Sequence, residues 1–351
     1  MIDRLRELGY EVVGPRVADG AITLGEITSI AELPLNVRDE QEPGKYRLTI
    51  SDGGYFDHVV GPHSLKPFVF PPRTTVLQVL KVRDSWEART PEPPRPKRAV
   101  LGVRSCDLHA LAIQDRVFLG GPHRDPEYAA RREGLFLVAV NCGRSVPTCF
   151  CVSMNTGPAV TGGADLVLTE LADGFVVQVG TERGSLVLAA LNCRECSSTE
   201  IADSNEVPRR AAAQQTRRIS LPTVHDTLMN NLNHPRWDDV AKRCLSCANC
   251  TMVCPTCFCS TVNEVTDLAG EHTTRERTWE SCFNEEHSWT GSGAVHPDTK
   301  SRYRQWLTHK LATWVDQFGT SGCVGCGRCI TWCPVGIDLT AEVAAMEGGA
   351  P

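Results

Sequence analysis

One cysteine pattern occurs twice in the last third of this chain, and it constrains the fold more than any other feature. Both copies have the form C-x2-C-x2-C-x3-C-P, which binds a 4Fe–4S cluster. The copies are Cys244-Leu-Ser-Cys247-Ala-Asn-Cys250-Thr-Met-Val-Cys254-Pro255 and Cys323-Val-Gly-Cys326-Gly-Arg-Cys329-Ile-Thr-Trp-Cys333-Pro334. Three cysteines at this spacing wrap a short loop around one cube, and each thiolate binds a different iron. The pattern therefore predicts two 4Fe–4S clusters.

Paired structural zinc sites are the alternative. Zinc usually takes two C-x2-C pairs, or one such pair with two histidines, so a third cysteine in each run would have no role. The spacing therefore favours iron–sulfur clusters.

The fourth cysteine of each run follows the loop and precedes a proline, and in two-cluster proteins it binds the other cube. We therefore expect crossed ligation. One cluster is predicted to take Cys244, Cys247, Cys250 and Cys333. The other is predicted to take Cys323, Cys326, Cys329 and Cys254. Because these ligands tie distant segments together, cluster binding and folding should be coupled.

A long insertion separates the two cysteine runs. Near its end, the sequence predicts a helix over 302–318. One face of this helix carries the apolar side chains of Trp306, Leu311, Trp314 and Phe318 and the stem of Lys310. We expect helices packed around the clusters, that is, an α-helical ferredoxin-like domain over residues 236–351. The nearby cations Arg302, Arg304 and Lys310 are expected on a solvated helix face, with docking of an acidic partner as the alternative.

Two further domains are predicted before this region, a β-rich subdomain over 1–97 and an α/β core over 98–235. The overall fold class is α+β, a mixed α/β domain followed by the helical dicluster domain. The predicted strands are Glu11–Val13, Ile22–Ile27, Tyr46–Ile50, Tyr55–Val60, Ala99–Val103, Leu135–Val140, Ala164–Leu171 and Phe175–Val179. The predicted helices, besides that over 302–318, are 2–9, Asp107–Val117 with Asp107 as its N-cap, Arg209–Arg218, His225–Leu232 and Leu339–Gly349, with a frayed Gly-Gly-Ala-Pro end.

Composition limits the setting of the chain. It has 351 residues, a net charge of −6 and 17 cysteines. The acidic balance argues against nucleic acid or an anionic membrane surface as a partner. No apolar run is long enough to span a membrane, and the first residues lack the apolar segment of a secretory signal. Many cysteines without export indicate metal binding in a reducing compartment, so we expect a cytoplasmic redox protein.

Nine cysteines lie outside the two runs. Cys106 and Cys142 each follow a predicted buried strand, where open α/β sheets place their ligands, and Cys149 and Cys151 come shortly after. These four cysteines form a possible third iron–sulfur site. If they bind nothing, we expect them in partly exposed loops. The alternatives are buried small hydrophobes and a rival set built on Cys257, Cys259 and Cys282. A further alternative is that Cys257 and Cys259 only pack beside a cluster and donate weak hydrogen bonds to its sulfides. Cys193 and Cys196 complete the nine, with no predicted role.

No nucleotide-binding fingerprint or catalytic arrangement is visible in the sequence. No G-x-G-x-x-G follows a strand, and there is no P-loop. We expect no catalytic residue in this chain, and no flavin or NAD(P) site within it. Two other classes of protein remain as alternatives, a self-contained flavoenzyme and a zinc-stabilised scaffold that only binds partners.

The chain resembles the iron–sulfur beta subunit of cytoplasmic NiFe hydrogenases of the sulfhydrogenase type, and the related A subunit of anaerobic sulfite reductases. The resemblance extends over almost the whole chain. It rests on Gly9-Tyr-Glu-Val-Val-Gly-Pro15, Pro43-Gly-Lys-Tyr-Arg-Leu48, Leu65-Lys-Pro-Phe-Val-Phe-Pro-Pro72, Gly102-Val-Arg-Ser-Cys-Asp-Leu108, Thr148-Cys-Phe-Cys151, Cys244–Cys259 and Cys323-Val-Gly-Cys-Gly-Arg-Cys329.

The resemblance implies a non-catalytic electron relay within an oxidoreductase complex. In that family, a flavin- and NAD(P)H-binding diaphorase subunit exchanges electrons with the beta-like subunit. The other partner is expected to be the NiFe hydrogenase small and large subunits. In the sulfite reductase alternative it is a sirohaem subunit. Both alternatives predict a hetero-oligomer whose flavin and NAD(P) are carried by the partner.

Overall fold

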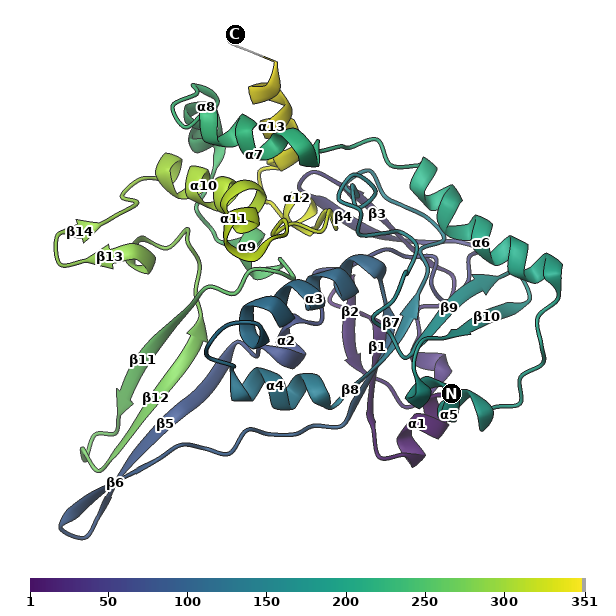
Figure 1. Ribbon diagram of the computed structural model, residues 1–351, viewed down its shortest axis with the longest axis horizontal. Coiled ribbons are helices and arrows are strands. Elements are labelled where there is room, and N and C mark those ends of the chain that lie inside the picture. Colours follow the sequence, from purple (N-terminus) through teal and green to yellow (C-terminus); the bar gives the residue numbers. More distant parts are fainter. Residues whose placement is uncertain (349–351) are drawn as a thin grey trace.

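The computed structural model describes residues 1–348 and shows three parts (Figure 1). An α/β body carries the N-terminus, a group of helices carries the C-terminal end, and a narrow β-sheet arm projects away from both. The predicted α+β class, with a mixed N-terminal part followed by a helical dicluster region, is confirmed. No helix within residues 1–348 is both long enough and apolar enough to cross a membrane.

A six-stranded sheet forms the centre of the body, in the order β10-β9-β8-β7-β1-β2. Its inner strands run parallel, and β2 and β10 are antiparallel edges. The bounds are β1 Glu11–Ala18, β2 Ala21–Glu26, β7 Arg98–Val103, β8 Leu135–Val140, β9 Leu166–Leu171 and β10 Gly174–Val179. All six correspond to predicted strands. The sheet takes strands from both predicted segments, 1–97 and 98–235.

Helices cover both faces of this sheet. Along β8, Leu135 and Leu137 face one core with α3 and α4, whereas Phe136 and Val138 face a second core with α1 and α5. This alternation is the period-two pattern of a strand buried on both sides. The helices of the body are α1 Ile2–Glu7, α2 Lys66–Val69, α3 Ser105–Leu119, α4 Pro126–Glu133, α5 Glu182–Ala189 and α6 Ser198–Ala213, with a 3₁₀ turn η1 Ile30–Glu32.

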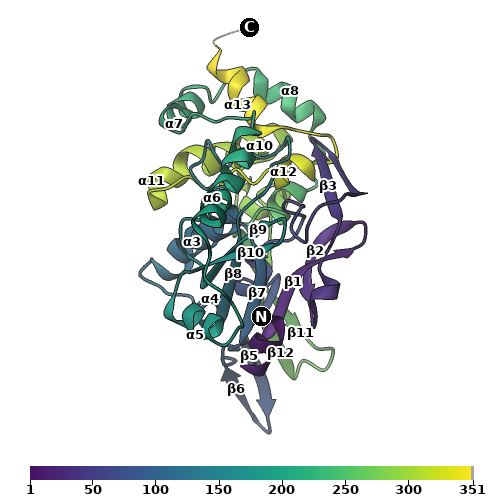
Figure 2. The ribbon, with the colours of Figure 1, turned by 90° about the vertical axis from the view of Figure 1, so that its right-hand side faces the viewer.

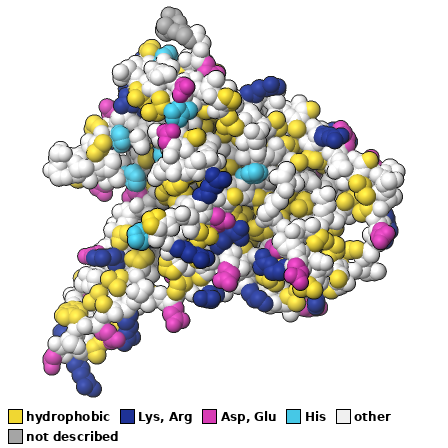
Figure 3. All heavy atoms as spheres, viewed as in Figure 1, with side chains coloured by type: hydrophobic (Ala, Val, Ile, Leu, Met, Phe, Trp, Pro, Cys, Tyr) yellow, Lys and Arg dark blue, Asp and Glu magenta, His cyan; other side chains and the backbone are white. Residues whose placement is uncertain are grey.

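The arm is a four-stranded antiparallel sheet in the order β11-β12-β5-β6, and the sequence did not predict it. Its strands are β5 Arg73–Val82, β6 Ser85–Arg89, β11 Ser260–Thr266 and β12 His272–Trp279. The insertion between the cysteine runs therefore begins as a hairpin paired with an N-terminal strand, so the expectation of helices alone was wrong there. Its apolar side chains Trp86, Val262, Val265 and Leu268 are exposed, and Figure 3 shows hydrophobic atoms along the arm.

Helices dominate the remainder of the chain, as predicted. The bounds are α7 Leu221–Asn230, α8 Arg236–Arg243, α9 Asn249–Met252, α10 Thr299–Thr308, α11 Trp314–Phe318, α12 Arg328–Thr331 and α13 Leu339–Glu347, with a π-helical turn η3 His309–Thr313, a 3₁₀ turn η2 Glu285–Ser288 and a small hairpin β13 Trp289–Thr290 and β14 Gly293–Ala294. The predicted helix over 302–318 is thus continuous through α10, η3 and α11. Of the predicted tail helix, Gly349 and the frayed end lie outside the described residues.

One predicted strand is absent, and the ends of several predicted elements differ from prediction. Residues 55–60 are not a strand, because a side chain takes the place of a neighbouring strand as hydrogen-bond acceptor. The carboxylate of Glu170 accepts hydrogen bonds from the Tyr55 and Phe56 N–H groups. The helix predicted over Arg209–Arg218 ends at Ala213, and that over His225–Leu232 ends at Asn230.

A second hairpin, β3 Val37–Glu42 and β4 Lys45–Ile50, reaches from the body to the C-terminal helices, as Figure 2 shows beside α12. Tyr46 stacks on Trp332 with ring centroids 5.0 Å apart, and the Gly44 N–H donates to the Ile330 carbonyl at 3.1 Å. The body is therefore fastened to the segment that carries the second cysteine run.

Candidate iron–sulfur centres

The two cysteine runs adopt the same loop. Ser246 and Ala248 in the first run, and Gly325 and Gly327 in the second, have positive φ at equivalent positions. In each loop the first cysteine sulfur accepts a backbone N–H at 3.4 Å, from Ser246 and from Gly325 respectively. A short helix then begins, α9 in one case and α12 in the other. The repeated sequence therefore builds two equivalent loops with their sulfurs on the inner side.

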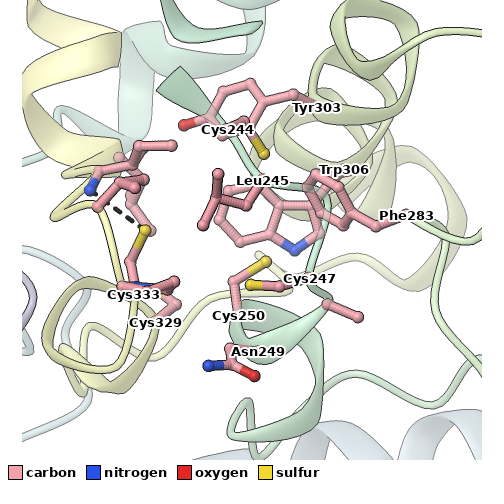
Figure 4. Close-up of a pocket in the computed structure, with 15 residues that line it drawn as sticks. Cys244, Leu245, Cys247, Asn249, Cys250, Phe283, Tyr303, Trp306, Cys329 and Cys333 are labelled. Atoms are coloured by element: carbon pink, nitrogen blue, oxygen red, sulfur yellow. Dashed lines mark hydrogen bonds between the residues drawn. The ribbon is translucent and has the colours of Figure 1, made fainter. Parts of the chain in front are cut away.

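The first loop lines a cavity together with the last cysteine of the second run. Figure 4 shows the sulfurs of Cys244, Cys247, Cys250 and Cys333 around this space. Burial raises the pKa of the Cys250 thiol, with Cys244 and Cys333 as the next contributors. The cavity lining thus brings together the four cysteines predicted for one cluster. Cys329 also reaches its wall.

The second loop gathers around the last cysteine of the first run. Burial raises the pKa of Cys329, and its neighbours Cys323, Cys326 and Cys254 raise it further. Cys254, Cys323 and Cys326 are buried, whereas Cys247 of the first group is exposed. Cys333 thus lies beside the first loop and Cys254 beside the second, and the exposed Cys247 places the first group nearer the surface.

Unpaired polar groups test whether the first cavity suits a cluster. The indole Nε1 of Trp306 and the hydroxyl of Tyr303 are buried without a hydrogen-bond partner, and both side chains line the cavity. Buried donors normally have a partner. The sulfides of a cluster accept such hydrogen bonds, so these donors fit a cluster in this space.

Two buried lysines provide positive charge at the second group. Lys310 lies on the π-helical turn, is only 2% exposed, and donates to Cys254 Sγ at 3.2 Å and to Cys257 Sγ at 3.4 Å. Lys66 donates to the Met252 carbonyl at 3.1 Å and lies 3.9 Å from the ring centroid of Trp279. Buried ammonium groups require an anion nearby. Cluster-bound thiolates would supply it.

The sequence placed Lys310 on a solvated face, and this was wrong. Arg302 is also buried, where it donates to the carbonyl of His296 at 2.9 Å. Burial alone would lower the pKa of Lys310, but Cys254 and Cys257 hold it well above its usual value. The pKa of Cys254 is well below its usual value, because the Cys257 thiol donates to its sulfur and Lys310 lies close. The position of Lys310 within hydrogen-bonding distance of Cys254 and Cys257 identifies it as a site residue. The sequence alone does not reveal this contact.

The four cysteines of the predicted third site are all buried. Partial exposure was expected only for unligated cysteines. Because all four are buried, exposure does not distinguish a third cluster from buried small hydrophobes. Cys106, Cys149 and Cys151 share one core group with Cys326. Burial raises the pKa of Cys151 to about 12, and Cys142 is the next contributor.

The remaining cysteines are arranged differently. Cys257 hydrogen-bonds to Cys254, and Cys259 to Cys282. The Cys282 thiol, followed by His287, lowers the pKa of Cys259 to about 4. Cys193 is exposed and Cys196 partly so. Within residues 1–348, no three His, Cys, Asp or Glu side chains converge closely enough to hold one metal ion. Thiolates that bind different irons of a cube need not converge in that way.

Asp107 was predicted as the N-cap of α3, and this was wrong. The N-cap position is Arg104, and Asp107 lies in the first turn. Its carboxylate instead accepts two hydrogen bonds from the guanidinium of Arg328, the residue between Cys326 and Cys329. A buried partner more than two hundred residues away outcompeted the local cap.

Comparisons with known proteins agree with this geometry. Residues 243–337 match the family model described as a 4Fe-4S dicluster domain. The chain is 30% identical to sulfhydrogenase 2 subunit beta of Pyrococcus furiosus, over 99% of this chain and 95% of that protein. No solved structure matches the chain. The chain is an iron–sulfur electron-transfer protein, and it belongs to the family of sulfhydrogenase iron–sulfur beta subunits.

Proposed function

We propose that this chain relays single electrons between a flavin subunit that uses NAD(P)H and a NiFe hydrogenase module. The crossed grouping of the eight cysteines carries the proposal. Cys333 lies with the first loop and Cys254 with the second, so the two sites share walls and lie next to each other. Adjacent one-electron sites, one near the surface and one buried, form a conducting path.

The residues of the chain hold and tune this path. The thiolates of Cys244, Cys247, Cys250 and Cys333 hold one cluster, and those of Cys323, Cys326, Cys329 and Cys254 hold the other. Each bound 4Fe–4S cluster supplies a one-electron carrier. The Trp306 indole N–H donates toward the first site, and Lys310 places positive charge at the second. Both contacts favour the more negative, reduced state.

Support for the partners comes from the relative's name and from this sequence. The relative is a subunit of a sulfhydrogenase. This chain contains no dinucleotide-binding fingerprint, so nicotinamide and flavin chemistry is assigned to another subunit. The exposed Cys247 and the 63% exposed Leu245 mark where a redox partner can approach the first cluster.

Anaerobic reconstitution tests the carrier role. The whole chain should bind at least about eight irons with equal sulfide, and dithionite should reduce it in one-electron steps seen by EPR. A Cys247→Ser variant should alter one signal, whereas the control Cys193→Ser should alter none. About four irons, or stoichiometric zinc, would contradict the proposal.

Purification of the tagged chain from its native host tests the partners. A flavoprotein and two NiFe hydrogenase subunits should co-purify, and the complex should evolve hydrogen from NAD(P)H. Co-purification of a sirohaem protein with NAD(P)H-dependent sulfite reduction would instead establish the sulfite reductase alternative and overturn the hydrogenase assignment. The isolated chain should turn over none of these substrates.

A further inference from the structure

We infer that Cys106, Cys142, Cys149 and Cys151 bind a third iron–sulfur cluster, of the 4Fe–4S type, inside the α/β body. The site extends the proposed relay, and its role as a carrier rests on that proposed function. Its existence does not, because it is argued from contacts within this chain.

Three separate segments deliver the four thiols to one place. Cys106 lies in the first turn of α3, Cys142 follows β8, and Cys149 and Cys151 lie in the loop after it. β7, which leads into α3, and β8 are parallel neighbours, so their carboxyl ends meet at one edge of the sheet. Valine, alanine and isoleucine side chains of one core group surround the thiols of Cys106, Cys149 and Cys151. A cluster needs this dry shell with four thiolates inside it.

A buried cation beside these thiols lacks an anionic partner. Arg104 is 2% exposed, and its guanidinium donates to the carbonyls of His58 at 2.7 Å and Phe56 at 3.1 Å. It also lies close to the Cys142 thiol. It forms no ion pair with any carboxylate in the described part of the chain. A buried guanidinium beside neutral thiols is costly, whereas four cluster-bound thiolates supply the missing negative charge.

A second donor points at the same group. Gln215, itself buried, donates from Nε2 to Cys151 Sγ at 3.2 Å. The backbone at Gly157 also passes close to the same sulfur, because an added Cβ there would lie 3.4 Å from it, at van der Waals contact. Donors to ligand sulfurs are characteristic of cluster sites, where they set the potential. Buried cysteines acting only as small hydrophobes have no need of them.

The loop that holds Cys149 and Cys151 packs directly on the second cysteine loop. The Phe150 N–H donates to the Gly325 carbonyl at 2.9 Å, and the Thr156 hydroxyl donates to the Val324 carbonyl at 2.6 Å. Cys326 lies in the same core group as Cys151. Clusters held at Cys326 and at Cys151 would therefore be neighbours, between which one electron could pass. No bond forms or breaks, and the proposed flavin partner supplies the electron.

The rival set fits a cube less well. Cys259 and Cys282 hydrogen-bond to each other, and Cys257 hydrogen-bonds to Cys254. Thiols in direct contact are too close to bind different irons of one cube. Cys257 therefore serves as a donor to Cys254, a predicted ligand of the second cluster.

Iron and sulfide analysis of the reconstituted whole chain tests the inference. The wild type should bind about twelve irons. The double variant Cys149→Ser with Cys151→Ser should lose about four of them and one EPR signal, and keep the signals of the other two clusters. The matched control, Cys193→Ser with Cys196→Ser, should retain about twelve.

Two outcomes would overturn the inference. One is about eight irons in the wild type, which needs no variant and so does not depend on whether the double variant folds. The other is unchanged iron in a folded Cys149→Ser, Cys151→Ser double variant. Either result leaves the two-cluster relay standing. If the reconstituted wild type instead shows no EPR signals from the two C-terminal clusters, the proposed two-cluster relay is contradicted, whereas the third site is not.

Discussion

Arg328 and Asp107 form a buried, two-bond ion pair that joins the second cluster loop to the first turn of α3. Both guanidinium nitrogens lie 2.8 Å from a carboxylate oxygen, with side chains 1% and 8% exposed. Each residue follows a proposed cluster cysteine closely, Asp107 after Cys106 and Arg328 after Cys326. The pair therefore fixes the relative positions of two proposed cluster sites.

Asp107→Asn should destabilise the protein strongly. Breaking a buried pair leaves Arg328 charged and unpaired, which costs about 3–5 kcal/mol. Anaerobic urea unfolding of the cluster-loaded chain measures this loss. The matched control is Asp238→Asn, whose partner Lys300 and carboxylate are both substantially exposed, and it should cost no more than about 1 kcal/mol. Equal losses in the two variants would contradict the structural role of the pair.

Lys310→Met should lower the reduction potential of the second cluster. The ammonium group donates to the Cys254 sulfur at 3.2 Å and stabilises the additional negative charge of the reduced state. We expect a decrease of at least about 60 mV, a tenfold change in a one-electron equilibrium, measured by EPR-monitored titration. Lys310→Arg should restore part of the shift. Lys242→Met, at an exposed lysine, serves as the control. An unchanged potential in Lys310→Met would refute this role.

Gly325→Ala should weaken the contact between the two loops. Gly325 has φ of +63°, and a Cβ there would lie 2.6 Å from the Cys151 backbone nitrogen. The left-handed conformation alone costs about 1–2 kcal/mol for a residue with a Cβ, and the backbone clash adds to it. The urea midpoint should fall clearly. Gly121→Ala, with nothing within 4 Å of its Cβ and no positive φ, should leave it almost unchanged. Similar midpoints would show that the loops do not pack as described.

The sequence predicted those elements that have a strong periodic pattern. β7 and β8 are continuous apolar runs, and the helix through Trp306 and Trp314 has a clear apolar face. The arm lacked such a signal, because β6 is exposed along its whole length and β11 along most of it. β5 pairs with β12, almost two hundred residues away. The strand predicted over residues 55–60 was wrong although their sequence pattern resembles a strand. Their N–H groups donate instead to the carboxylates of Glu170 and Asp39.

The candidate sites show the same division. The eight cysteines of the two runs were visible at once because their ligand spacing is local. Lys310 and Arg104 were not identified, because a buried cation looks like any surface lysine or arginine in sequence. Only the fold reveals that Lys310 faces Cys254 and that Arg104 faces Cys142.

Crossed ligation is the central claim, and EPR of single variants of the reduced whole chain tests it most directly. Cys247→Ser and Cys326→Ser, each in the middle of one loop, identify the two C-terminal signals. Cys333→Ser should then alter the signal that Cys247→Ser alters, because Cys333 lies at the cavity of the first loop. If Cys333→Ser instead alters the signal assigned by Cys326→Ser, each run binds its own cluster and the crossed arrangement is wrong.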